Sequence, residues 1–311
     1  MTTKVSPFSE NAFLLAQHSV DASDRVFITG ASGWFGRTAT LMFHKMGIPT
    51  YLMGSHNRTI EYLGHSFEIN EWNLSAIKKF QPTVVIDCAY LTREFAESVS
   101  LDEYVSTNRE LLDRITQISK LPSITRIISF SSGAAYPYVL GNATNGLMED
   151  PYGFLKYEAE LRLTNEIDAD DCKVTIPRVW SVSGALVTKI QGFAFSDLIF
   201  QARSGKIAIS SDREVFRRYC AIEEVIAVAM ADTSSTHSIF DTGGESIEIR
   251  ELAKMVSSII NPNATITQVN PSNSESNDYQ STNRDWVARC SDLSFLPMSI
   301  EEQISLVSSW M

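Results

Sequence analysis

A glycine-rich turn between an apolar strand and a helix constrains this chain more than any other feature. The run Val26-Phe27-Ile28 is followed by three glycines and then by residues 37–46, which have the pattern of a helix. Glycine tolerates the backbone of a tight turn, and its lack of a Cβ lets a pyrophosphate approach. The N-terminus of the helix adds free N–H groups and partial positive charge. The pattern predicts a dinucleotide site formed by Gly30, Ser32, Gly33, Trp34, Phe35 and Gly36.

The charge and composition of the chain argue against several kinds of partner. Its 311 residues carry a net charge of −11, and 44% of them are hydrophobic. We therefore expect a full core and an acidic surface that repels nucleic acid and anionic membranes. The sequence has neither a membrane-span pattern nor a signal-peptide pattern, which predicts a cytoplasmic location. The four cysteines and five histidines are scattered, so we expect no metal site.

Apolar runs and amphipathic stretches alternate over the first 180 residues. This alternation predicts an α/β fold, namely a Rossmann-like, doubly wound parallel sheet with a smaller C-terminal substrate lobe. The run 83–88 is largely apolar, as is typical of a parallel strand covered on both faces. The expected strands are 26–29, 50–53, 83–88, 126–131 and 173–180, and the expected helices are 37–46, 74–80, 102–119, 152–166 and 193–204.

The pattern loosens after residue 180, although no linker is long enough to separate independent domains. The later expected elements are helices 222–232, 248–260 and 299–309, strand 238–242 and a loop over 261–285, which is rich in Asn, Ser, Thr and Pro. The predicted parts are an N-terminal extension (1–24), a dinucleotide-binding domain (25–180, with 222–245 returning to it) and a substrate-binding lobe (181–221 and 246–311).

A second group of polar residues falls at the carboxyl ends of the expected strands, where ligands bind in such sheets. One strand ends in Ala89 and Tyr90, which we expect at the cofactor and at the substrate, respectively. The next strand runs into Ser132, and a helix then begins with Tyr152, four residues before Lys156. Positions i and i+4 share one face of a helix, so the lysine ammonium can approach the tyrosine ring.

This group of residues suits proton transfer to a carbonyl oxygen. A phenol with a pKa of about 10 is a poor proton shuttle at neutral pH. A nearby ammonium, together with an oxidised nicotinamide, favours the phenolate and lowers that pKa. Ser132 can hydrogen-bond a substrate oxygen beside Tyr152. With a hydride delivered to the carbonyl carbon, the site would be that of an alcohol dehydrogenase or a ketone reductase.

From about residue 25 to residue 311, the chain resembles the extended short-chain dehydrogenase/reductase superfamily, and within it the NAD-dependent epimerase/dehydratase family. The matching positions are the glycines Gly30, Gly33 and Gly36, the helix asparagine Asn108, and the catalytic residues Ser132, Tyr152 and Lys156. The resemblance implies a catalytic role for Asn108, whereas an asparagine on a helix also commonly hydrogen-bonds locally. It further implies that Asn73 and Leu74 lie near the adenine.

The resemblance extends to the substrate side. Arg217-Arg218-Tyr219 is similar to the family's Arg-Asp-Tyr segment, whose arginine commonly meets the substrate diphosphate. It implies a nucleotide-diphosphate sugar bound by Arg217, and the alternative is an ion pair of Arg217 with Glu214 or Glu223. The resemblance also implies a homodimer formed through the helices 102–119 and 152–166.

Three positions depart from the family pattern, and all lie on the substrate side. They are Pro137, Arg218 and Ala221. The departures leave the cofactor prediction intact and leave the identity of the sugar open.

The end of the second expected strand decides between NAD and NADP. An NAD site usually places Asp or Glu there to bind the ribose 2′-hydroxyl, and such an acid would repel a 2′-phosphate. Residues 52–58 contain no acid. Ser55 and Arg58, with Arg37, could bind the phosphate instead. We therefore expect NADP(H), with NAD as the alternative cofactor.

The first functional hypothesis is an NADP-dependent reductase of a nucleotide-linked keto-sugar, such as a 4-keto-6-deoxy sugar, with the proton supplied by Tyr152. A dehydratase is disfavoured, because Ser132-Gly133-Ala134 stands where such members, by resemblance, carry Thr-Asp-Glu. The alternatives are a sugar-nucleotide 4-epimerase with tightly bound NAD, a non-catalytic NADP(H)-sensing module, and a reductase of ketones or aldehydes that carry no nucleotide.

Overall fold

The chain forms two compact units in a computed structural model that describes residues 6–143, 146–269 and 275–311. The sheet unit spans Gln17–Val179 and Ala229–Phe240, and the lobe unit spans Met1–Ala16, Trp180–Val228 and Asp241–Met311. The segment returning to the sheet unit is thus 229–240, shorter than the expected 222–245. Residues 1–5 of the expected extension and 270–274 of the expected loop lie outside the described ranges.

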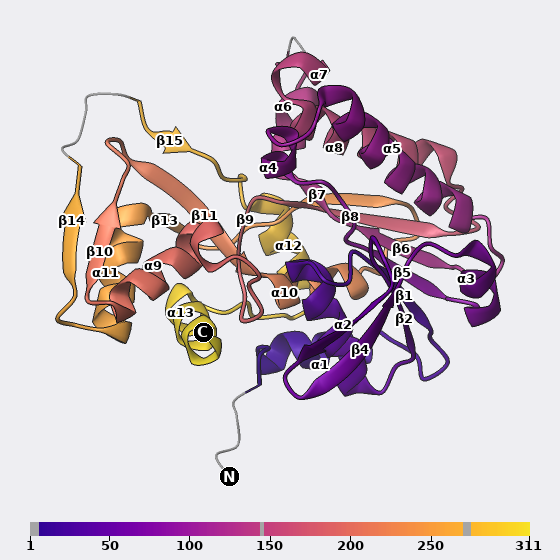
Figure 1. The fold of residues 1–311 in the computed structure, drawn as a ribbon, viewed down its shortest axis with the longest axis horizontal. Helices are drawn as coiled ribbons and strands as arrows, with labels where there is room; N and C mark the ends of the chain where they lie inside the picture. The colour runs from indigo at the N-terminus through magenta and orange to yellow at the C-terminus, as the bar shows by residue number, and fades with distance from the viewer. Residues whose placement is uncertain (1–5, 144–145, 270–274) are drawn as a thin grey trace. The chain divides into compact units, whose positions relative to one another are not determined.

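A nine-stranded sheet forms the core layer of the sheet unit (Figure 1). Its order is β12 (Ser238–Asp241), β8 (Lys173–Val179), β6 (Arg126–Ser129), β5 (Val84–Asp87), β1 (Val26–Thr29), β2 (Thr50–Met53), β4 (His65–Asn70) and β3 (Arg58–Tyr62), and β7 (Ser131–Ser132) pairs with β8. The pairings from β8 across to β4 are parallel, and β3 runs antiparallel to β4. The strand order reverses at β1 and β5, and doubly wound sheets bind ligands at such a switch point.

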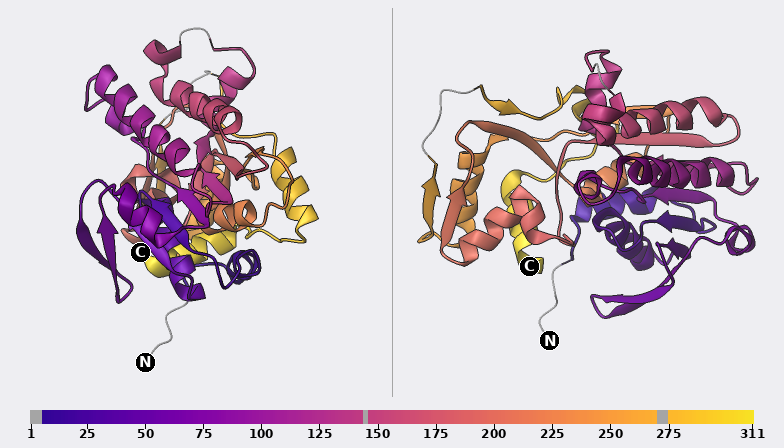
Figure 2. Two further views of the ribbon diagram at one scale, coloured as in Figure 1. Left: turned by 90° about the vertical axis from the view of Figure 1, so that its right-hand side faces the viewer. Right: turned by 45° about the horizontal axis from the view of Figure 1, so that its top comes forward.

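Helices cover both faces of this sheet. On one face, α3 (Leu74–Phe80), α5 (Leu101–Ile118) and α8 (Pro151–Glu166) bury apolar side chains against the strands. The helix α2 (Trp34–Met46) lies on the opposite face (Figure 1). The two views of Figure 2 show α5 and α8 running side by side. The predicted Rossmann-like, doubly wound fold is confirmed.

The two long helices of the sheet unit begin at residues that favour a helix start. The hydroxyl of Ser100 accepts a hydrogen bond from the N–H of Glu103 at the beginning of α5. The carboxylate of Asp150 accepts one from the N–H of Gly153, and Pro151 occupies the first position of α8. Side-chain acceptors at the cap and proline at the first position are both favoured at helix N-termini.

A β-hairpin that was not predicted follows β2. Its strands, β3 and β4, are joined by Leu63 and Gly64, whose φ angles are 56° and 79°. Two successive residues with positive φ form the type I′ turn that joins short hairpins. Leucine is uncommon in that conformation, so the turn has no recognisable turn sequence.

The remaining elements of the sheet unit surround the start of α8. They are α4 (Arg93–Ala96), η1 (Gly133–Ala135), α6 (Tyr136–Val139) and α7 (Gly146–Glu149). All four pack against α8, so the helix that carries Tyr152 is held from several sides.

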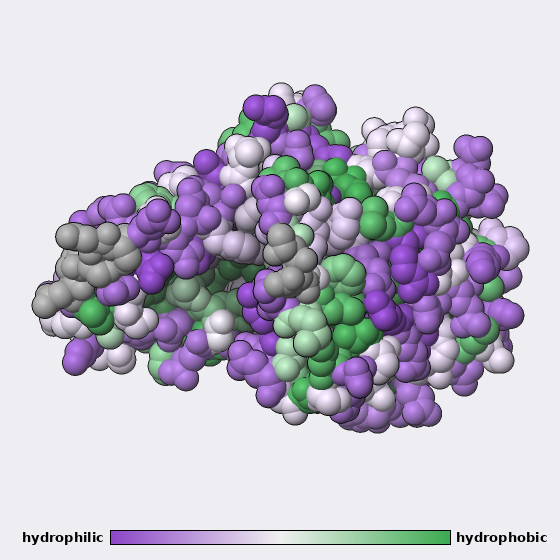
Figure 3. Space-filling model, turned by 90° about the horizontal axis from the view of Figure 1, so that it is seen from above, coloured by the Kyte–Doolittle hydropathy of each residue, from purple (hydrophilic) through white to green (hydrophobic). Residues whose placement is uncertain are grey.

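The outer faces of α5 and α8 are polar. Arg109 pairs with Glu158 at 2.7 Å, and Arg162 pairs with Asp113 at 2.8 Å. Hydrophilic residues cover much of the right-hand part of Figure 3, which views the molecule from above. Along the described ranges, every helix falls short of the length and apolar character that crossing a membrane requires. The homodimer expected through this helix pair stays a prediction.

The lobe unit has a hydrophobic core of its own. Helices α9 (Ala194–Arg203), α11 (Ile249–Ile260) and α13 (Ile300–Trp310) pack around β10 (Lys206–Ile209), β11 (Val215–Ala221) and β13 (Ser246–Glu248). The other elements are α1 (Glu10–His18) and α10 (Ile222–Met230), both of which end in the sheet unit, with β9 (Ser181–Ser183), η2 (Ile190–Gly192) and α12 (Arg284–Asp292).

The prediction of a loop over 261–285 is wrong in part. Two strands form there: β14 (Thr265–Gln268) pairs with β10, and β15 (Asn277–Asp278) pairs with β11. The side chains of both strands are mostly exposed. Because neither strand buries an apolar face, neither shows the alternation by which strands are recognised in a sequence.

Candidate functional site

Two glycines of the turn after β1 are required by close backbone packing. Gly30 has a φ of 59°, and a Cβ on it would lie 2.6 Å from the carbonyl oxygen of Cys88. A Cβ on Gly36 would lie 2.3 Å from the carbonyl oxygen of Gly30. At Gly33 the corresponding distance to that oxygen is 3.3 Å, so protein packing restricts this position less. Packing within the protein therefore explains the small size of Gly30 and Gly36 better than that of Gly33.

The helix α2 begins directly at this turn. Gly33 is its N-cap and provides no side chain to bond the first N–H groups. The N–H of Ala31 donates to the carbonyl of Met53 at 3.1 Å, which ties the turn to β2. The ring of Phe35 lies 4.6 Å from the ring of Phe130 and holds the start of α2 against the end of β6. The first N–H groups of a helix lack intrahelical acceptors, so this N-terminus suits a pyrophosphate.

A basic group lies beside the turn. Arg58, the first residue of β3, donates a hydrogen bond to the hydroxyl of Ser32. Its Nη1 lies 3.2 Å from Nε2 of His56, whose Nδ1 lies 3.0 Å from the hydroxyl of Ser55. The structure therefore brings together the three residues expected here, Ser32, Ser55 and Arg58. It adds His56, which the sequence reading did not single out.

A second arginine, Arg37 on α2, lies over the ring of Tyr62 on β3, at 5.8 Å from the ring centroid. Within the described part of the chain, the Nε atoms of Arg37 and Arg58 are both buried and have no hydrogen-bond partner. Buried donors of charged groups that lack an acceptor are costly unless a ligand supplies one. Both arginines therefore have unused capacity to bind an anion.

Asn73 and Leu74 lie at the beginning of α3. The side-chain oxygen of Asn73 accepts a hydrogen bond from the N–H of Ala76 at 3.0 Å, which makes it the N-cap. Both residues follow the carboxyl end of β4, which is parallel to β2. They therefore lie at the edge of the sheet that also carries the glycine turn.

Asp87 joins the carboxyl ends of β1, β5 and β6. Its carboxylate accepts hydrogen bonds from the hydroxyls of Thr29, at 2.7 Å, and Ser129, at 2.8 Å. The hydroxyl oxygen of Thr29 in turn accepts from the N–H groups of Cys88 and Ala89, both at 3.0 Å. Burial raises the pKa of Asp87, and the two hydroxyls oppose that shift. This network fixes Ala89 at the switch point of the sheet.

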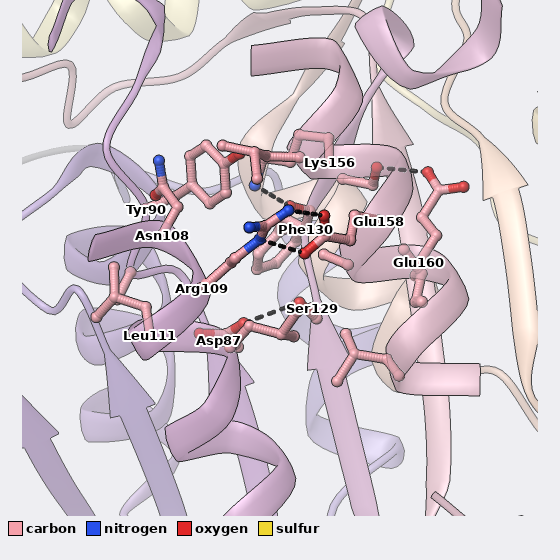
Figure 4. Close-up of a pocket in the computed structure, with 17 residues that line it drawn as sticks. Asp87, Tyr90, Asn108, Arg109, Leu111, Ser129, Phe130, Lys156, Glu158 and Glu160 are labelled. Carbon is pink, nitrogen blue, oxygen red and sulfur yellow. Dashed lines mark hydrogen bonds and ion pairs between the residues drawn. The ribbon is translucent and has the colours of Figure 1, made fainter. Parts of the chain in front are cut away.

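Lys156 on α8 is buried, with its ammonium group at the same strand ends. Its Nζ donates to the carbonyl of Phe130 at 2.7 Å and lies 3.6 Å from the centroid of the Tyr90 ring (Figure 4). Burial lowers the pKa of Lys156 to about 8, although attraction by Asp87 acts in the opposite direction. A lysine with this pKa changes charge close to physiological pH, as groups at reactive sites often do.

Tyr152 lies one helical turn before Lys156. Its ring meets the ring of Tyr90 edge-on, with 5.7 Å between centroids. The guanidinium carbon of Arg93 lies 5.4 Å from the Tyr152 ring centroid, and Arg93 pairs with Asp150 at 3.1 Å. Tyr90, which we expected at the substrate, thus contacts both residues of the Tyr-x3-Lys pair.

Asn108 holds the chain that leads away from Tyr90. Its side-chain oxygen accepts from the N–H of Leu91 at 2.9 Å, and its amide nitrogen donates to the carbonyl of Tyr104 at 3.1 Å. The hydroxyl of Tyr104 donates to the carbonyl of Leu91 at 2.7 Å. The side chain of Asn108 is therefore engaged with the backbone, as the local-bonding alternative anticipated, and its direct effect is on the position of Tyr90.

Ser132 is buried where β7 runs into η1. Its hydroxyl oxygen accepts from the N–H of Ala134 at 3.2 Å. The start of α8 packs tightly on this segment, since a Cβ on Gly153 would lie 2.5 Å from the carbonyl oxygen of Ala134. Tyr152 therefore belongs to the helical turn that touches the segment carrying Ser132.

Glu160 is a further residue of this region that sequence reasoning missed. It follows Lys156 by one more helical turn, accepts a hydrogen bond from the hydroxyl of Ser131, and pairs with Arg178 at 2.7 Å. Only 2% of the Glu160 side chain is exposed. The signal was present, because Tyr152, Lys156 and Glu160 recur every four residues and so share one face of a helix.

A small cavity lies between α5 and α8, with a volume of about 30 Å³ (Figure 4). Its polar lining includes Asp87, Tyr90, Asn108, Ser129, Lys156 and Glu160. This volume suffices for about one water molecule. The cavity is therefore too small to be the binding site of a sugar.

Arg217 belongs to the lobe unit. Its Nη1 donates to the carbonyls of Phe216, at 2.7 Å, and Asn277, at 3.0 Å, and its guanidinium lies 5.6 Å from the centroid of the Tyr279 ring. Among the residues described, these contacts take the place of the alternative ion pair with Glu214 or Glu223. One terminal nitrogen of the guanidinium is thus held by two carbonyl groups, which orients the side chain.

The neighbouring Arg218 is held in a similar way. It donates to the carbonyls of Ser281, at 3.1 Å, and Gly244, at 2.9 Å. Both arginines of the pair are therefore anchored by backbone oxygens of their own unit.

The fold and this arrangement define a dinucleotide-binding enzyme, and comparisons with known proteins agree. The chain belongs to the NAD dependent epimerase/dehydratase family, whose sequence profile matches residues 26–237. The family expected from the glycine turn and the Tyr-x3-Lys pair is thereby confirmed. No curated protein matches the sequence significantly.

Several solved structures share the fold over most of their length. The UDP-glucose 4-epimerase of Thermotoga maritima, solved with UDP-glucose, is 17% identical over 92% of this chain and 98% of its own, with a TM-score of 0.70. The UDP-glucose 4-epimerase of Brucella ovis, in complex with NAD, is 16% identical with the same coverage and a TM-score of 0.69. MoeE5, in complex with UDP-glucose and NAD, is 17% identical over 92% and 98%, with a TM-score of 0.68.

Proposed function

We propose that this protein is an NADP-dependent reductase of a nucleotide-linked keto-sugar. The observation that carries the proposal is the contact between Arg58 and Ser32, which sets a guanidinium group against the glycine turn. A second arginine, Arg37, contacts the other end of β3 at Tyr62 and also has a buried Nε without a hydrogen-bond partner among the described residues. A 2′-phosphate would pair with these groups, whereas no carboxylate in residues 52–58 offers a partner to the ribose hydroxyl of NAD.

The residues present fit a bound dinucleotide. The exposed position of Gly33 and the uncapped N-terminus of α2 suit the pyrophosphate. Ser55 and Arg58 would hold the 2′-phosphate, and Asn73 and Leu74 would lie near the adenine. Ala89 would border the nicotinamide half. When bound, the reduced nicotinamide supplies a hydride to the carbonyl carbon of the substrate.

The protein's own residues would supply the proton and the orientation. The phenol of Tyr152 gives its proton to the substrate oxygen as the hydride reaches the carbon, so the ketone becomes an alcohol and the phenol becomes a phenolate. The ammonium of Lys156 stabilises that phenolate until a proton from solvent restores it. Ser132 hydrogen-bonds the same substrate oxygen and holds it toward Tyr152.

The nucleotide part of the proposal comes from the lobe unit and from the comparisons. Arg217 offers a guanidinium that carbonyl groups already orient, and such a fork suits a diphosphate. The related structures were solved with UDP-glucose and, in another MoeE5 complex, with UDP-glucuronic acid. We therefore propose a nucleoside-diphosphate keto-sugar as the substrate.

A panel of nucleoside-diphosphate keto-sugars, assayed with NADPH and separately with NADH, tests this function. Loss of NADPH absorbance in proportion to alcohol formed supports it, and NADPH should outperform NADH. The control is Tyr152→Phe, which should bind NADPH normally and lose nearly all turnover. A Tyr152→Phe protein with unchanged turnover would refute the proposed mechanism. Cofactor binding without turnover on any substrate would indicate a sensor.

One alternative has its own support, since UDP-glucose 4-epimerases are among the structurally similar proteins. An epimerase would use the same tyrosine for transient oxidation and would retain NAD through turnover. NAD released on denaturation of the purified protein, with inversion at C4 and no net cofactor consumption, would favour that reading. Stoichiometric consumption of NADPH would exclude it.

A further inference from the structure

The ring of Tyr90 covers the ammonium group of Lys156. Nζ lies 3.6 Å from the ring centroid, well inside the range of about 6 Å within which a cation is attracted to an aromatic face. Figure 4 shows these two side chains meeting; Tyr90 comes from the segment that follows β5, and Lys156 comes from α8. Lys156 is 9% exposed, so the contact is made away from water, where such attraction is strongest.

The backbone on both sides of Tyr90 is anchored. Before it, the N–H of Ala89 is bound by the hydroxyl of Thr29 at 3.0 Å. After it, the N–H of Leu91 donates to the side-chain oxygen of Asn108 at 2.9 Å, and the carbonyl of Leu91 accepts from the hydroxyl of Tyr104. The position of the ring over Lys156 is therefore built into the fold.

We propose that Tyr90 is a positioning residue for Lys156: the face of its ring binds the ammonium and keeps it charged at the carboxyl ends of the strands. The inference rests on the proposed function only in giving that charge a catalytic use. An aliphatic side chain over Nζ would favour the neutral amine, whereas an aromatic face stabilises the charged ammonium. A hydrogen bond from Nζ to the carbonyl of Phe130 sets the direction of the group.

Other groups that face Lys156 have to be kept constant in any test. Asp87 at the end of β5, Cys88 directly after it and Glu160 from α8 itself raise the pKa of the ammonium. The ring of Tyr152 meets the Tyr90 ring edge-on, and the Arg109–Glu158 pair lines the adjoining cavity. Substitutions at Tyr90 leave all of these in place, so they isolate the contribution of the ring.

The hydroxyl of Tyr90 provides the matched control. Within the described residues it is buried and has no hydrogen-bond partner. Tyr90→Phe therefore removes a group that makes no bond and keeps the aromatic face. Tyr90→Leu keeps an apolar cover and removes the face.

The test is a pH titration of the Lys156 ammonium by NMR, on protein labelled with 13C at lysine Cε and without cofactor or substrate. The resonance is assigned by its loss in Lys156→Arg. In the parent protein the midpoint should lie near the pKa of about 8 that burial gives this lysine. We expect Tyr90→Phe to stay within a few tenths of a pH unit, and Tyr90→Leu to fall by about one unit.

Equal midpoints in the parent and in Tyr90→Leu would overturn the proposal. If Tyr90→Leu does not fold, a phenylalanine analogue with three ring fluorines can replace Tyr90. The analogue keeps the shape of the ring and weakens the negative potential on its face. It should lower the midpoint relative to Tyr90→Phe, and an unchanged midpoint would be equally decisive. Because the titration uses no cofactor or substrate, a protein that fails as a reductase still gives a result here.

Discussion

Glu160 and Arg178 form a buried ion pair: the carboxylate accepts from Nε of the arginine at 2.9 Å and from its Nη2 at 2.7 Å. Arg178 stands opposite Ser131 in the pairing of β7 with β8, and Ser131 donates to the same carboxylate. One side chain of α8 thus ties the helix to two strands. The residue next to Ser131 is Ser132, so this pair also fixes the position of the expected catalytic serine.

Glu160→Gln should destabilise the protein strongly. Removing one charge of a buried pair leaves the other without compensation, which costs roughly 3–5 kcal/mol. We expect a loss of this order in the free energy of unfolding, measured with a chemical denaturant. The matched control is Glu110→Gln on α5, whose side chain is 64% exposed and pairs with Arg114. Exposed pairs contribute about 1 kcal/mol or less, so equal losses in the two variants would contradict this account.

Arg58→Ala should weaken NADPH binding by about 10- to 100-fold and leave NADH binding nearly unchanged. Hydrogen bonds to charged groups contribute about 1.5–3 kcal/mol, and only NADPH carries the phosphate that Arg58 is proposed to meet. Fluorescence titration of both cofactors against the variant measures the two affinities. Lys120→Ala removes the same charge from an exposed position and controls for the net charge. Equal weakening of NADH and NADPH by Arg58→Ala would refute the phosphate assignment.

Alanine at Gly36 should be far more damaging than alanine at Gly33. The new Cβ would lie 2.3 Å from a backbone oxygen at Gly36 and 3.3 Å from the same oxygen at Gly33. We expect Gly36→Ala to unfold at a clearly lower temperature than the parent. Gly33→Ala should lose less stability, and it should lose cofactor affinity, because Gly33 is proposed to lie against the pyrophosphate. A thermal melt and a cofactor titration on each variant separate the two effects. Equal unfolding temperatures for Gly36→Ala and Gly33→Ala would show that the closer backbone contact at Gly36 does not determine stability.

The parts of the site that could be predicted depend on local properties of the sequence. The glycine turn is recognisable because a short apolar strand precedes it and a helix follows it. Tyr152 and Lys156 are recognisable because their spacing matches one turn of a helix that begins after a strand end. In each case the information lies in one continuous stretch of the chain.

The parts that could not be predicted depend on distant partners. Asp87 is bonded to Ser129, 42 residues further on, and Glu160 to Arg178, 18 residues further on. Nothing near an isolated acid in the sequence shows that it will be buried and paired. Tyr90 lies three residues beyond the end of β5 at Asp87, close to the expected strand end, but its contact with Lys156 depends on how a helix from another part of the chain packs over it.

Glu223 and Glu224, at the start of α10, give the protein a further pH dependence. They are 1% and 0% exposed, and burial raises their pKa values to about 8 and about 7. An unfolded glutamate titrates at about 4.3, so the native state keeps protons that the unfolded chain releases. The stabilising effect of this protonation is full below the unfolded pKa and is lost as the pH rises through the native values.

The two glutamates together should therefore lower the free energy of unfolding by roughly 7 kcal/mol between about pH 5 and about pH 9, because each loses about 1.4 kcal/mol per pH unit until the pH passes its native pKa. Denaturant titrations across that range measure the decline. Glu223→Gln keeps the size and polarity of the side chain but cannot ionise. It should flatten the decline and be more stable than the parent at the alkaline end, whereas Glu245→Gln, at an exposed position of the same unit, should decline like the parent. Of these two carboxyls, only that of Glu223 is buried enough to hold its proton at neutral pH. If the free energy of unfolding of Glu223→Gln and of Glu245→Gln fell with pH in the same way, the fall would have to come from other groups.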